Sequence, residues 1–157
     1  MLENHLTKAL REHIAKALDG LILPAQNGEP RQPQIVNGYL PPKRTSYNDD
    51  FPFVIVRPEK GRVEMGQTVV SIAIIIGCYT EEMDGHEHCL NVFSRIRNAL
   101  AMMPNQTLAK RYQLAFPLSW TLHAEQPYPL WQIDVSTEWT IITPEIRSER
   151  EDEIYGI

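Results

Sequence analysis

The sequence has few of the residues that form covalent or membrane-spanning frameworks. It contains two cysteines, Cys78 and Cys89, in 157 residues. Disulfide-stabilised domains use many more, so both are interpreted as small buried apolar side chains. The longest apolar run is too short for a transmembrane helix, and the N-terminus lacks the basic and then apolar pattern of a signal peptide. These absences predict a protein of the cytoplasm without a membrane partner.

Basic charge is also low. Fifteen Lys and Arg stand against twenty Asp and Glu, which gives a net charge of -5. Surfaces that bind nucleic acid by neutralising phosphates are usually positive, so the composition disfavours that class of partner and leaves only a local basic patch open. The length, with 43% hydrophobic and 22% charged residues, predicts a single soluble domain over residues 1–157.

The sequence lacks a recognisable catalytic or metal-binding motif. No Ser/His/Asp or Cys/His arrangement, phosphate-binding glycine loop or metal quartet occurs. His86, His88 and Cys89 include zinc-type ligands, but only His86 and Cys89 share a face of the predicted helix, and no second ligand pair follows. We therefore predict no enzymatic activity, no catalytic residue, no cofactor and no bound metal.

An acidic loop follows the longest apolar run. Glu81, Glu82 and Asp84 could suggest a hard-metal site or an acid/base pair, but their spacing fits no calcium loop. Asp84 and Glu87, three residues apart, resemble a capping box for the next helix, and we favour that interpretation.

The organising element of the chain is the uncharged stretch QTVVSIAIIIGCY at residues 67–79. Six of its residues are β-branched aliphatics, which favour a central strand rather than a helix. The stretch is apolar on both faces. It therefore needs cover on both sides, from helices on one and from a second layer, the long loop or another subunit on the other.

The remaining elements follow from periodicity. Apolar residues at spacings of three and four predict helices over residues 2–21 and 86–103. Alternation predicts strands over residues 51–57, 118–124 and 130–142, with a turn at 58–61. Trp120, Trp131 and Trp139 fall on the inward phase, which favours core packing over a ligand-stacking platform.

Two segments fall outside these elements. Residues 25–50 are rich in Pro, Gly and Asn, with Ile35, Val36, Tyr39 and Leu40 as apolar islands. The segment could cover the second face of the sheet, contact a partner, or do both. Residues 143–157 form a polar, charged tail that could reach a neighbour.

Together these elements predict an α+β two-layer sandwich. We expect a mostly antiparallel sheet of about four strands with both helices on one face.

Four stretches carry a resemblance to a known family. They are FPFVIV at 51–56, GCYTEEMDG at 77–85, HCLNVFSRIRNAL at 88–100 and QPYPLWQIDVSTEWTI at 126–141. In this order they resemble small tail proteins of long-tailed bacteriophages and prophages, and are similar to the tail terminator family, which includes the lambda tail terminator. The resemblance covers roughly residues 51–153.

The resemblance implies a structural virion protein that caps the head-proximal end of the tail tube as a hexameric ring. Such a protein ends tube polymerisation and joins the tail to the head. Its partners would be further copies of itself, the tail tube protein and the head–tail connector protein, while DNA passes through the lumen. It would be found in the host cytoplasm during assembly and then in the virion tail.

A ring contact needs two different patches on each subunit. From loop position and charge, the interface candidates are Arg31, Arg44, Tyr47, Lys60, Arg62, Glu149 and Arg150. The nearest alternative function is another head–tail joining or minor tail protein of the same fold. The alternative from a different class is a small host metal-binding enzyme that uses His86 and Cys89.

Overall fold

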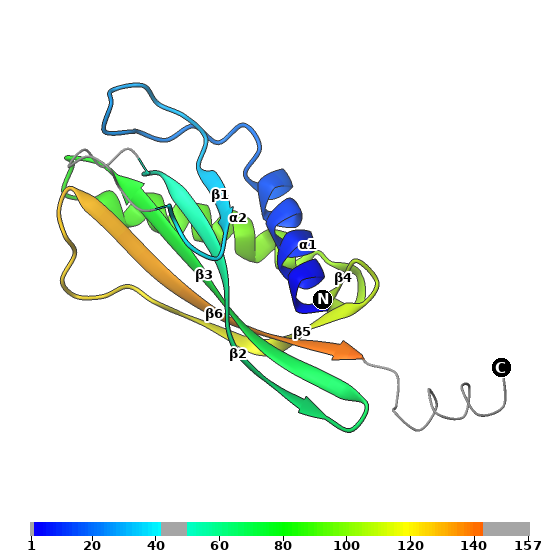
Figure 1. Ribbon diagram of the computed structural model, residues 1–157. Helices are drawn as coiled ribbons and strands as arrows, with labels where there is room; N and C mark the ends of the chain where they lie inside the picture. Colours follow the sequence, from blue (N-terminus) through cyan, green and yellow to red (C-terminus); the bar gives the residue numbers. More distant parts are fainter. Residues whose placement is uncertain (1, 42–49, 143–157) are drawn as a thin grey trace, which may run out of the picture.

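The computed structural model describes residues 2–41 and 50–142 (Figure 1). In chain order its elements are α1 (Leu2–Ala17), β1 (Gln34–Asn37), β2 (Phe53–Glu64), β3 (Gln67–Tyr79), α2 (Gly85–Ala101), the 3-10 turn η1 (Pro104–Gln106), β4 (Thr107–Leu108), β5 (Tyr112–Thr121) and β6 (Leu130–Ile142).

The strands form one six-stranded sheet in the order β1-β2-β3-β6-β5-β4. β1 runs parallel to β2, whereas the other neighbours are antiparallel, so the sheet is mixed. It curls into a half-barrel with two helices. The predicted two-layer sandwich with about four strands was therefore wrong. β1 and β4 have only four and two residues, and such short strands are defined by pairing partners rather than by a periodic pattern.

β3 is the central strand, as the sequence predicted, and its bounds are residues 67–79. It pairs with β6 from Gln67↔Ile142 to Tyr79↔Leu130, so the two longest apolar strands are adjacent along their whole length. Their long antiparallel ladder fixes the register, because a one-residue slip would exchange the two faces of β3.

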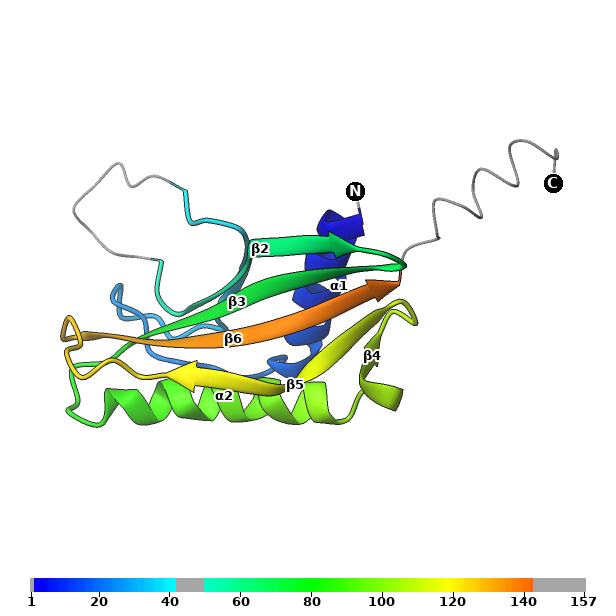
Figure 2. The same ribbon diagram turned by 90° about the horizontal axis from the view of Figure 1, so that it is seen from below.

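Both helices pack against the same face of this sheet, and Figure 2 shows α2 running along it. Leu6, Leu10 and Ile14 of α1 are completely buried, as are Val92 and Ile96 of α2. Each buried aliphatic side chain contributes about 1.5–3 kcal/mol relative to exposure. The apolar stripes of the two helices therefore account for much of the main core, which they share with Val54, Val56, Val70, Ile72, Ile74, Ile76, Ile133 and Val135.

The opposite face carries a second, smaller cluster formed by Phe51, Phe53 and Ile55. Val36 and Leu40 pack against it. Both come from the predicted loop at 25–50, so part of that segment covers the second face. The loop prediction missed β1, which lies in the same segment and pairs through Ile35↔Val54.

Three local predictions were wrong. β2 continues through the turn predicted at 58–61 and reaches Glu64, with a bulge between Pro58 and Lys60. β5 begins at Tyr112 rather than Leu118. Asp84 makes no side-chain cap at α2; the backbone N–H of Glu87 donates to its backbone carbonyl at 2.9 Å instead.

The three tryptophans differ in exposure. Trp131 and Trp139 are buried, as predicted, but Trp120 is 49% exposed. Trp120 nevertheless keeps the inward position, because it pairs with the fully buried Val135 and its ring centroid lies 6.1 Å from that of Phe93 on α2. Its exposure follows from the place of β5 near the edge of the sheet.

Candidate interaction surfaces

At one end of the sheet the β2–β3 hairpin extends past β1. β1 pairs with β2 only from Phe53 to Val56, whereas β2 and β3 stay paired to Glu64↔Gln67. We call residues 58–67 the arm. Figure 1 shows that the end of the arm projects beyond both helices.

Two apolar side chains near the end of the arm are exposed. Val63 is 81% exposed and Met65 is 96% exposed, the highest value among the exposed large hydrophobic residues in the described ranges. A single exposed apolar side chain is ordinary, but two near the end of one hairpin are a candidate contact surface. Sequence reasoning missed them because the expected turn at 58–61 placed Val63 and Met65 in a connecting loop. The alternation Arg62, Val63, Glu64, Met65 was the available signal.

Charged side chains brace the arm on its other face. Arg62 donates a hydrogen bond to Glu64, and Gln67 donates to the same carboxylate at 2.9 Å. The guanidinium of Arg62 also lies 3.6 Å from Glu138 on β6. The hydrogen bond between Arg62 and Glu64 raises the pKa of Arg62 and lowers the pKa of Glu64. Both groups are exposed, so these contacts orient the arm rather than stabilise the fold appreciably.

The open sheet edges are poorly suited to pairing with another chain. Pro58 lacks an N–H donor and is followed by a bulge, and Lys60 adds a charge. On the opposite edge, Pro117 lies within the bulge of β5. Proline, bulges and charge all discourage strand addition. Contacts at the arm are therefore expected through side chains rather than through sheet extension.

Three of the interface candidates from the sequence lie in the described ranges. Lys60 and Arg62 lie together on the arm. Arg31 is half-buried and donates from Nη2 to the backbone oxygen of Phe51 at 2.9 Å, so it ties the β1 region to the start of β2. Arg44, Tyr47, Glu149 and Arg150 lie outside the described residues.

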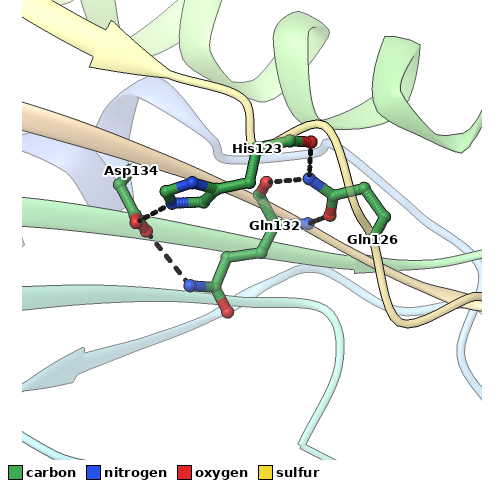
Figure 3. A network of polar contacts seen from close by, with 4 residues as sticks. All are labelled: His123, Gln126, Gln132 and Asp134. Carbon is green, nitrogen blue, oxygen red and sulfur yellow. Dashed lines mark hydrogen bonds and ion pairs between the residues drawn. The ribbon is translucent and has the colours of Figure 1, made fainter.

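A polar network fixes the connection between β5 and β6 (Figure 3). Asp134 accepts from Gln132 at 3.1 Å and contacts His123 Nε2 at 3.0 Å. The Gln126 side chain donates to the His123 carbonyl and accepts from the Gln132 backbone N–H, at 2.9 and 2.8 Å. A histidine–carboxylate pair can orient a general base. Within the described ranges, Asp134 is the only hydrogen-bond partner of the His123 ring.

The predicted alternative metal ligands are not arranged as a site. Cys89 is fully buried in the main core, and the ring of His86 lies 6.4 Å from that of Trp131. A hydrogen bond with the Cys89 thiol, together with burial, raises the pKa of Cys78. The raised pKa keeps the Cys78 thiol in its neutral form. Among the described residues, no three His, Cys, Asp or Glu side chains are grouped closely enough to hold a metal ion.

No helix in the described ranges has the length and apolar character needed to cross a membrane.

Comparisons with known proteins identify a structural neighbour but no family. No known protein family and no curated protein matches the chain. A solved structure described as "Virion of native gene transfer agent (GTA) particle" contains a chain with 10% sequence identity and a TM-score of 0.45. The alignment covers 88% of this chain and 95% of that chain.

Proposed function

We propose that this protein is a structural virion protein of a phage or prophage tail. In this role it caps the head-proximal end of the tail tube as a ring, ends tube polymerisation and joins the tail to the head connector. The proposal rests on the four sequence stretches that resemble tail terminators. The structural observation that carries it is the arm, which presents Val63 and Met65 to solvent.

The arm supplies a contact of the type that a ring requires. A closed ring uses a heterologous interface, in which one patch of each subunit meets a different patch of the next. A projecting hairpin with two apolar side chains at its end suits insertion into a neighbouring subunit or into the tube. Pro58 and the bulge after it discourage strand pairing between subunits, so such a contact would not extend into a continuous sheet.

The charge of the chain is compatible with passage of DNA. A net charge of -5 gives little general attraction for phosphates, so a duplex in the lumen would not be retained by the subunit surface as a whole.

The first experiment measures the mass of the protein by light scattering over a concentration series, with and without the tail tube protein encoded beside it. The metal content of the same sample is also analysed. A hexamer, or a monomer that is recruited to tube ends, would support the proposal. A metal-loaded monomer indifferent to tubes would contradict it and favour the host metal-binding enzyme. The same measurement with the connector protein added covers the nearest alternative. Binding to the connector without any effect on tubes would identify another head–tail joining protein.

A further inference from the structure

A largely apolar groove lies where the C-terminal ends of α1 and α2 meet the turn before β5. Its volume is about 480 Å³. The helices are tied together at this place, because Nε2 of His13 lies 2.9 Å from the backbone oxygen of Ala99. The apolar lining includes Ala17, Ala99, Met102, Met103, Pro104 and Leu108.

The ionisable lining of this groove is basic. Lys16 and His13 line it, and an adjoining hollow that shares Pro104 with it adds Lys110. No acidic residue within the described ranges lines either hollow. Met102 is 82% exposed, so the groove also presents a large flexible apolar side chain to solvent. The groove therefore suits a segment that combines apolar and acidic residues.

The backbone at the rim of the groove is unusual. Asn105, Gln106, Ala109 and Lys110 have φ values of 52°, 57°, 53° and 59°, and they are all the non-glycine residues with positive φ in the described ranges. Positive φ is disfavoured for residues with a Cβ atom, and such conformations cluster where the surrounding structure imposes a functional shape. The turn that forms the rim is thus held in a costly conformation.

The chain itself contains a segment with matching chemistry. Residues 143–157, TPEIRSEREDEIYGI, carry five carboxylates and two arginines, a net charge of -3. Three consecutive acidic residues, Glu151 to Glu153, immediately precede Ile154 and Tyr155. Acidic and apolar groups are therefore adjacent in this segment, as basic and apolar groups are in the groove.

The segment also starts close to the groove. Ile141 pairs with Tyr112, and Tyr112 pairs with Leu108, which lines the groove. Neighbouring strands are about 4.8 Å apart, so two steps across the sheet separate Ile141 from Leu108 by about 10 Å. Fifteen residues can span up to about 50 Å when extended. The segment can therefore reach the groove of its own chain without strain.

We propose that residues 143–157 dock into the groove of the same chain. Ile154 and Tyr155 contact the methionines and Leu108, while the acidic residues before them lie beside Lys16 and Lys110. Docking of this kind covers apolar surface on the free subunit. The proposal does not depend on the ring function, since it concerns contacts within one chain.

The test uses the full chain with a nitroxide spin label at Gly156→Cys and methyl-labelled methionine. Native Cys78 and Cys89 are buried, so the label attaches to the new cysteine alone. We expect the methyl signals of Met102 and Met103 to lose more than half of their intensity. Met83 precedes the opposite end of α2, about 25 Å away along the helix, and its signal should be nearly unaffected. Equal losses at all three positions, or none at Met102 and Met103, would overturn the proposal.

Charge reversal in the groove and the adjoining hollow provides a second test. The double variant Lys16→Glu, Lys110→Glu should restore most of the Met102 signal, because it places acidic groups opposite the acidic segment. Lys60→Glu, an exposed lysine on the arm, is the matched control and should leave the signal reduced. An unchanged loss in the double variant would contradict the proposed contact.

A mixing experiment distinguishes docking within a chain from docking between chains. Spin-labelled chains without isotope are mixed with isotope-labelled chains without spin label. We expect no signal loss in this mixture and no effect of dilution on the singly labelled sample. Loss at Met102 in the mixture would show that the segment docks on a neighbouring copy and would overturn the intramolecular proposal.

Discussion

Gly85, the first residue of α2, packs directly against the indole ring of Trp131 on β6. A Cβ atom built at Gly85 would lie 2.1 Å from Trp131 Nε1, closer than any real contact. The same nitrogen donates to the backbone oxygen of Thr80 at 3.1 Å, so the ring cannot move without losing a buried hydrogen bond. The close approach of helix and strand at this end of the sheet therefore requires glycine.

Replacing Gly85 with alanine should destabilise the fold. The added methyl group must displace Trp131, and overpacking of this type typically costs about 1–3 kcal/mol. Urea unfolding followed by tryptophan fluorescence measures the change. Glu87→Ala, an exposed substitution in the same helical turn, should stay within about 0.5 kcal/mol of the wild type. A Gly85→Ala variant as stable as the Glu87→Ala control would show that the ring has room to move.

Thr137 should be essential to the core because its hydroxyl group connects two buried groups. It donates to the backbone oxygen of Ile72 at 2.8 Å and accepts from Nε1 of the fully buried Trp139 at 2.8 Å. Thr137→Val leaves the indole N–H without its partner, which costs about 1–3 kcal/mol. Thr137→Ser keeps the hydroxyl and should lose less. Chemical denaturation of both variants checks this order, and a more stable valine variant would refute it.

The buried thiol of Cys78 should make stability fall at alkaline pH. Its pKa is raised in the folded state, so the native thiol keeps its proton while the unfolded thiol loses it above about pH 8.5. The free energy of unfolding should therefore be unaffected by this group below that pH. Above it, the stability should decline by about 1.4 kcal/mol per pH unit from this group. Unfolding of wild type and Cys78→Ala between about pH 7 and pH 10 should give a shallower decline for the variant. Parallel curves would show that the thiol does not contribute.

The long elements were predictable because their signals are local. The strand at 67–79 and the strand at 130–142 are both found at the expected residues, since β-branched content and alternation persist over their whole length. Both helices were also located, although α1 ends at Ala17 rather than Leu21. When apolar periodicity extends over this many residues, few other secondary structures fit the sequence.

The rest depends on pairing, which a single sequence does not encode locally. Pro58 predicted a turn, yet β2 passes through it because β3 supplies partners as far as Glu64 and a bulge absorbs the irregularity. β1 exists because Ile35 and its neighbours lie beside β2. The same pairing builds the arm, and without it the only local signal for Val63 and Met65 was the alternation of apolar and charged residues at 62–65. Among the interface candidates, only Lys60 and Arg62 share that arm.

The most direct test of the proposed function is the length of tail tubes polymerised from purified tube protein and measured by electron microscopy. Wild-type protein should bind at one tube end and shorten the length distribution. The arm variant Val63→Ser, Met65→Ser should fold normally, because both side chains are exposed, but should leave the tubes as long as those without added protein. The matched control Ile22→Ser, Met83→Ser changes two exposed apolar residues elsewhere and should act as wild type. Tubes of unchanged length with wild-type protein, or full activity of the arm variant, would contradict the account.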